Sequence, residues 1–136
     1  MIVTNYNRFL GYLFIALSLI SLGIFILGEM MHVNVNFTHY IPLLICFIFG
    51  WMYLVKPYFK ISDTEILIIP LIGPFKKKIP HGGYQNICID GNNLYLYKEG
   101  KRFRVKVKKW MARPSDWNKL VKYLQDEDLT KELHDI

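Results

Sequence analysis

Two long apolar runs dominate the first 56 residues of the chain. The first, 9–27, holds 19 residues without a charge, and a helix of this length is roughly 28 Å long. The second, 40–55, holds 16 residues, and residues 37–39 extend it at its N-terminal end. Because the hydrocarbon core of a bilayer is about 30 Å thick, the pattern predicts two membrane-spanning helices, over about 9–27 and 39–56.

Two alternatives to these spans stay open. A cleaved signal peptide would use Arg8 as its positive flank, although the first run is long and no A-x-A-like cleavage site follows it. A soluble core helix is the alternative for the second run, but the 80 residues that follow are too few to bury both runs. We therefore expect residues 1–56 to form a transmembrane helical hairpin. The first run carries a stripe of small residues that would allow close helix contact: Gly11, Ser18, Ser21 and Gly28. The alternative is that this spacing arises by chance.

The distribution of cations predicts the orientation of this hairpin. The connecting segment 28–39 contains no Lys or Arg, whereas Arg8 precedes the first run and several lysines, beginning with Lys56, follow the second. Loops rich in Lys and Arg stay on the cytoplasmic side. We expect a multi-pass protein of the cell (plasma or inner) membrane, with both termini cytoplasmic and a short loop outside.

Beyond residue 56 the pattern changes to short alternating runs separated by turn signals, which is typical of a small antiparallel β-domain. The expected strands are 58–61, 65–72, 75–79, 85–89, 94–97 and 102–108, with a flexible loop at 80–83. The last strand, RFRVKVK, alternates strictly. Its period of two predicts three apolar side chains in the core, those of Phe103, Val105 and Val107, and four cations on the opposite face.

A helix is expected to follow Pro114, with Ser115 as its cap. Its apolar residues recur at helical spacing and should cover the open side of the sheet: Trp117, Leu120, Val121 and Leu124. The β-domain is thus expected over 57–125, and the remaining residues, 126–136, are expected to form an acidic tail, either frayed or a short amphipathic helix.

The charges change the picture of this domain. Residues 1–56 contain only Arg8, Glu29 and Lys56, and the other 25 of the 28 charged residues come later; residues 57–109 have 11 Lys and Arg against 4 Asp and Glu. A cation close to an anionic leaflet contributes about 1 kcal/mol of binding. The residues expected to contact lipid headgroups or an acidic partner are Lys76, Lys77, Lys78, Arg102, Arg104, Lys106, Lys108 and Lys109. The alternative is a solvated strand face that merely satisfies the positive-inside pattern.

The sequence offers little for other chemistry. It contains no G-x-S-x-G, P-loop, H-E-x-x-H or paired-carboxylate pattern, and Cys46 and Cys88 form no CxxC motif. His32 and His39 share the connecting segment with Glu29 but are better explained as loop residues. We predict no catalytic residues, no cofactor and no metal, and the scarcity of aromatics beside the cations argues against nucleic-acid binding despite a pI of about 9.3.

The order of these elements resembles the bacterial pleckstrin-homology-like (PH-like) domain family of small membrane proteins. The segments that carry the resemblance are YFKISDTEILI (58–68), KKKIPHGGYQNICI (76–89), LYLYKEGKRFRVKV (94–107) and DWNKLVKYL (116–124). The resemblance implies an α+β fold, an antiparallel β half-barrel capped by a C-terminal helix, beside the two transmembrane helices. It implies no enzyme activity. One departure is the His81-Gly82-Gly83 segment, where such proteins often have an aromatic residue shortly after the I-P pair.

These patterns favour a non-enzymatic, membrane-anchored interaction module whose basic PH-like domain contacts the inner leaflet and an unidentified membrane protein partner. Two other hypotheses are a small immunity protein against membrane-active peptides and an accessory subunit of a larger membrane complex. A peptide challenge of a sensitive host expressing the protein would separate the immunity role from the others. Purification in native detergent would distinguish a module from a stable subunit.

Overall fold

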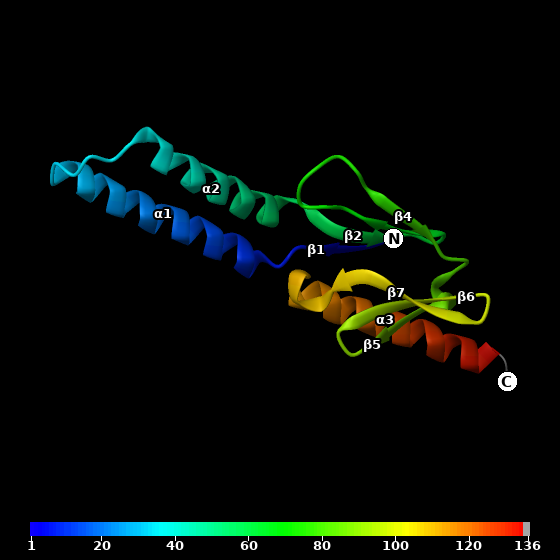
Figure 1. Ribbon diagram of the computed structural model, residues 1–136. Coiled ribbons are helices and arrows are strands. Elements are labelled where there is room, and N and C mark those ends of the chain that lie inside the picture. The colour runs from blue at the N-terminus through cyan, green and yellow to red at the C-terminus, as the bar shows by residue number, and fades with distance from the viewer. Residues whose placement is uncertain (135–136) are drawn as a thin grey trace. The chain divides into compact units, whose positions relative to one another are not determined.

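The computed structural model of this protein describes residues 1–134, with side chains through residue 127, and divides into two compact units. One unit, which we call the helical hairpin, is Asn7–Lys56; the other, the β-domain, combines Met1–Tyr6 with the chain from Pro57 onward. Figure 1 labels the elements of both. The chain therefore leaves the β-domain after six residues and returns to it fifty residues later.

The hairpin consists of two long apolar helices, as the sequence predicts. Helix α1 is Arg8–Met30, and Asn7 caps it by accepting a hydrogen bond from the backbone N–H of Phe9 at 3.1 Å. Helix α2 is Tyr40–Val55, preceded by one 3₁₀ turn, Phe37–His39. Helix α1, with 23 residues, and the segment Phe37–Val55, with 19 residues when the 3₁₀ turn is counted with α2, are each long and apolar enough to cross a membrane.

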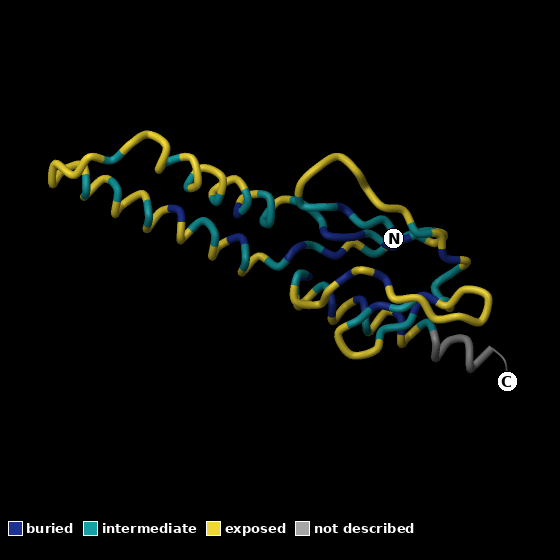
Figure 2. Tube along the Cα trace, viewed as in Figure 1, coloured by how far each residue is buried: buried dark blue, intermediate teal, exposed yellow. Residues whose placement is uncertain are grey.

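Small residues form the contact between the two helices. Within residues 7–56 the buried positions are Gly11, Ser18 and Gly50, whereas the large apolar residues are exposed or half-buried (Figure 2). The hydroxyl of Ser18 donates to the carbonyl of Leu43 at 3.1 Å, and a Cβ placed on Gly50 would lie 2.8 Å from the carbonyl oxygen of Gly11. Two members of the predicted stripe, Gly11 and Ser18, thus bring the backbones together.

A four-stranded antiparallel sheet begins the β-domain, in the order β1-β2-β3-β4. Its strands are β1 Ile2–Asn5, β2 Pro57–Ile61, β3 Glu65–Ile68 and β4 Lys77–Pro80. Strand β1, which the sequence analysis missed, pairs with β2 so that Thr4 lies opposite Phe59. The first six residues therefore belong to the β-domain, and the boundary expected at residue 56 holds only on the C-terminal side of the hairpin.

Strands β3 and β4 are shorter than the pattern suggests. The strand expected over 65–72 ends at Ile68, and the one expected over 75–79 begins at Lys77. Proline at position 70 cannot donate to the ladder, and Gly73 has a φ of 95°, a turn conformation that L side chains rarely adopt. Residues 69–76 consequently form a loop between β3 and β4.

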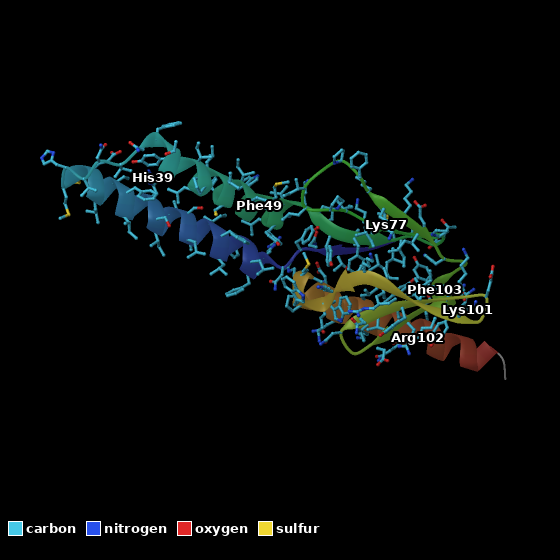
Figure 3. The ribbon with its side chains drawn as sticks, viewed as in Figure 1. His39, Phe49, Lys77, Lys101, Arg102 and Phe103 are labelled. Atoms are coloured by element: carbon cyan, nitrogen blue, oxygen red, sulfur yellow. The ribbon has the colours of Figure 1, made fainter. Side chains whose placement is uncertain are left out.

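A three-stranded antiparallel sheet follows, in the order β5-β6-β7. Its strands are β5 Ile87–Asp90, β6 Asn93–Lys98 and β7 Lys101–Lys108. Val105 and Val107 are buried as predicted, but Phe103 is half exposed, so its expected place in the core is wrong. Phe103 lies near the β6–β7 turn (Figure 3), closer to the end of the strand than the buried Val105 and Val107.

Helix α3, Pro114–His134, completes the β-domain and lies along the three-stranded sheet (Figure 1). Three residues of the predicted stripe are buried, Trp117, Leu120 and Leu124, and the Trp117 ring meets Phe59 of β2 edge-on at a centroid distance of 6.5 Å. The core thus joins the helix to the first sheet. The segment predicted as a separate acidic tail continues the same helix through His134.

Candidate functional site

The lysine cluster 76–78 lies where the β3–β4 loop enters β4, and all three side chains are exposed. Lys77 pairs with Ile68 and Lys78 with Leu67, so these neighbouring lysines point to opposite faces of the sheet. The ammonium of Lys78 is 3.9 Å from the Glu65 carboxylate, at the long end of an ion pair between exposed groups. Because β4 is an edge strand, the cluster lines the rim of the sheet.

The cations of β7 have a different setting, on the outer face of the second sheet. Arg104 lies opposite Tyr95 and Arg102 opposite Tyr97. The guanidinium of Arg102 stacks 3.7 Å from the centroid of the Tyr95 ring and donates to Asp90 at 2.8 Å. This hydrogen bond raises the pKa of Arg102 above its ordinary value. This face therefore presents arginines beside tyrosine rings, with Arg102 held in place by Tyr95 and Asp90.

The eight predicted contact residues thus do not form one patch. Figure 3 shows Lys77 on β4 and Arg102 on β7, which belong to different sheets. Within β7 itself, Arg102 and Lys108 are six residues apart, which corresponds to roughly 20 Å along an extended strand. Lys106 lies between them, and Lys109 begins the 3₁₀ turn Lys109–Met111.

One end of the four-stranded sheet collects several segments, and we call it the attachment end because the chain joins the hairpin there, at Tyr6 and Pro57. The Tyr6 hydroxyl donates to the carbonyl of Ile69 at 2.7 Å, and the Ile69 N–H donates to the carbonyl of Tyr58 at 2.9 Å. Tyr6 also forms a β-bridge with Ala112. The β3–β4 loop and the segment after β7 therefore both begin at this end.

Exposed apolar side chains gather at the attachment end. In the β3–β4 loop Ile72 is 59% exposed and Phe75 is 85% exposed, and after β7 Trp110 is 58% exposed. Ile72 and Phe75 were both predicted to lie in strands, which is wrong, since they lie in the loop between β3 and β4. Pro70 could have indicated the end of the strand, because proline is rare inside a central strand.

The loop at 80–83, predicted to be flexible, is instead held by His81, which is 3% exposed. Its Nε2–H donates to the carbonyl of Ser62 at 2.7 Å, and its Nδ1 accepts the Gly83 N–H at 3.2 Å. The Ser62 hydroxyl donates to the carbonyl of Glu65 and accepts the Glu65 N–H, which closes the turn between β2 and β3. The imidazole therefore faces a backbone carbonyl rather than the serine hydroxyl, so this cluster ties two loops together and does not pair a nucleophile with a base.

Tyr84 belongs to the same cluster and makes the β-domain sensitive to alkali. Its hydroxyl donates to Asp63 at 2.9 Å, and burial, followed by this bond, raises its pKa from 10.0 to about 12. The folded state thus favours the neutral phenol, and this contribution to stability is complete below pH 10 and disappears as the pH rises to about 12. We expect Tyr84→Phe to lose less stability than the wild type across that interval in urea unfolding. Parallel pH profiles of the two proteins would contradict this.

No group of three or more His, Cys, Asp or Glu side chains suitable for a metal occurs among the residues that the structure describes. Glu29, in the last turn of α1, accepts a hydrogen bond from the hydroxyl of Tyr40, the first residue of α2, at 2.7 Å. In the segment between the helices the His39 ring contacts the carbonyl of Asn36 at 3.0 Å. Beside His81, a cavity of about 310 Å³ is lined by Pro80, Asn86, Leu96 and Tyr97, among others. This volume is at the lower limit for a small-molecule site.

Comparison with protein-family models, curated proteins and solved structures found no match to this chain.

Proposed function

We propose that this protein is a non-enzymatic, membrane-anchored interaction module, in which a PH-like β-domain lies at the inner leaflet and contacts anionic lipid and an acidic protein partner. The observation that carries the proposal is the pairing of β1 with β2. These strands flank the hairpin in sequence yet form one sheet, so both ends of the hairpin must lie on the same side of any membrane that it enters.

The inside-out packing of the hairpin supports a lipid environment. A soluble protein buries its large apolar side chains, whereas α1 and α2 bury glycine and serine and expose leucine, isoleucine and phenylalanine. Contact through small residues is typical of helices that associate within a bilayer, where lipid already solvates the apolar surface. The segment between the helices contains no Lys or Arg, which favours its location outside.

The two sheets and the C-terminal helix support a PH-like arrangement of the β-domain, with β1 completing the first sheet. The Arg102 and Arg104 face is the part that suits an acidic partner. The Arg102 guanidinium is held by Tyr95 and Asp90, and an ordered arginine loses little conformational freedom when it binds a carboxylate. Such a surface needs no catalytic group to act as a docking site.

Cysteine reporters in the full chain test this proposal, in a background that carries Cys46→Ser and Cys88→Ser. In intact cells we expect a membrane-impermeant maleimide to modify Asn34→Cys, between the helices, and not Glu99→Cys, in the β6–β7 turn. Both should react after permeabilisation. Alkaline carbonate should leave the protein in the membrane fraction. Labelling of Glu99→Cys in intact cells, or release by carbonate, would refute the proposal.

A further inference from the structure

The β3–β4 loop, residues 69–76, combines a fixed base with an apolar tip. At the base, Ile69 is buried and hydrogen-bonded on both sides, to Tyr6 and Tyr58. At the tip, Ile72 and Phe75 flank Gly73 and Pro74 and expose most of their side-chain surface. Phe75, at 85%, has the largest exposed fraction of the large apolar side chains in the part of the chain whose side chains are described. Such exposure to water is unfavourable, so burial of the tip in an apolar environment would stabilise it.

The loop emerges at the attachment end of the sheet. Ile68, the last residue of β3, lies opposite Phe59 on one side and Lys77 on the other. The peptide bond between Lys56 and Pro57 joins the same end of β2 to the hairpin. The β3–β4 loop therefore begins beside Phe59, two residues from Pro57, where the β-domain is joined to the helices that we place in lipid.

The charge next to the tip fits an anionic lipid surface. Lys76, Lys77 and Lys78 directly follow Phe75, and residues 69–78 contain no Asp or Glu. The alternation of β4 sends lysine side chains to both faces of the sheet, so cations surround the apolar tip instead of lying on one side of it. An aromatic and aliphatic tip with a collar of lysines is the composition of segments that settle at the headgroup–acyl boundary.

We propose that the β3–β4 loop inserts Ile72 and Phe75 into the boundary between headgroups and acyl chains, while Lys76, Lys77 and Lys78 contact anionic headgroups. This inference rests on the proposed function, because the bilayer is the one that holds the hairpin. It adds a second membrane contact, which restricts the orientation of the β-domain. The lysine pair that points to opposite faces has a role in this arrangement that a single basic face would not provide.

Spin labels in the full chain, reconstituted in nanodiscs of phosphatidylcholine and phosphatidylglycerol, test the insertion. Labels are placed singly at Ile72→Cys, Phe75→Cys and Glu99→Cys, with Ile24→Cys as the marker for the hairpin, in the background that carries Cys46→Ser and Cys88→Ser. At positions 72 and 75 we expect frequent collisions with oxygen and collisions with a water-soluble nickel chelate that are several-fold rarer than at position 99.

Charge variants test the collar in the Phe75→Cys reporter. Replacing Lys76, Lys77 and Lys78 by Gln should raise the collisions of the label with the nickel chelate, since each lost cation near an anionic surface changes the binding equilibrium by about fivefold. The matched control replaces Lys98, Lys101 and Lys106 by Gln, removes the same charge from the second sheet and should leave the label at position 75 unchanged. Discs of phosphatidylcholine alone should reproduce the effect of the first triple variant.

Each other outcome overturns the inference. Labels at 72 and 75 that meet the nickel chelate as often as the label at 99 place the loop in water. Labels shielded from both reagents place it against protein. If position 24 remains accessible to oxygen and shielded from the chelate, only the loop insertion fails; if position 24 meets the chelate freely, the membrane anchoring fails as well.

Discussion

A chain that starts at Pro57 is expected to be unfolded, whereas residues 1–6 joined by a short Gly/Ser linker to residues 57–136 should fold without the hairpin. Strand β1 covers the edge of β2, and the first six residues contribute two fully buried side chains, Thr4 in β1 and Tyr6 directly after it. The Tyr6 ring stacks on Tyr58 at a centroid distance of 4.6 Å. Asn5 and Pro57 are register partners, so a short linker, of the length of a β-turn loop, can join Tyr6 to Pro57.

The free-energy cost of losing β1 should be comparable with the whole stability of the domain. Loss of β1 exposes buried residues of β2, removes a row of ladder hydrogen bonds and frees the site where Asp116 of α3 accepts the Asn5 N–H at 3.1 Å. Because small domains are stable by only about 5–15 kcal/mol, the cost is comparable with the total. Far-UV circular dichroism and urea unfolding measure it. The control is the linked chain with residues 2–6 scrambled, and cooperative unfolding of the chain that starts at Pro57 would contradict the prediction.

The second large effect is expected at the helix contact of the hairpin. In Gly50→Leu the new Cβ would lie 2.7 Å from Ile15 Cγ1 and 2.8 Å from the carbonyl oxygen of Gly11, and backbone cannot move aside as a flexible side chain does. Overpacking of this kind costs about 3 kcal/mol. We expect the hairpin to unfold at a lower mole fraction of dodecyl sulfate in mixed micelles, followed by circular dichroism.

Gly23→Leu is the matched control, because nothing lies within 4 Å of a Cβ placed on Gly23 of α1. Both substitutions replace glycine by leucine and raise helix propensity equally. The difference between their unfolding midpoints therefore reports only the contact between α1 and α2 at Gly50. We expect Gly23→Leu to leave the midpoint unchanged or raise it slightly. Equal midpoints for the two variants would mean that α1 and α2 do not pack through Gly11 and Gly50.

Part of the candidate surface was accessible to sequence reasoning. The alternation in β7 correctly placed Val105 and Val107 in the core and the cations outside, since a period of two depends only on the strand itself. The same rule failed at Phe103, which lies near the β6–β7 turn, because burial needs packing neighbours as well as a direction. The exposed loop tip at Phe75 was missed because a short apolar run can be a strand or a loop until its partners are known.

The chain itself determined the two long apolar helices and the C-terminal helix, because periodicity and hydrophobicity within a continuous segment suffice to specify such elements. Strand β1 was decided only by tertiary structure. Ile2–Asn5 is four residues long and has no pattern of its own. It becomes a strand because it pairs with the edge of β2, which follows in the sequence only after the helical hairpin. The fixed position of His81 has the same origin, since its hydrogen-bond partner at Ser62 belongs to another turn. Contacts between distant segments depend on the closure of the fold, and no local pattern of residues contains that information.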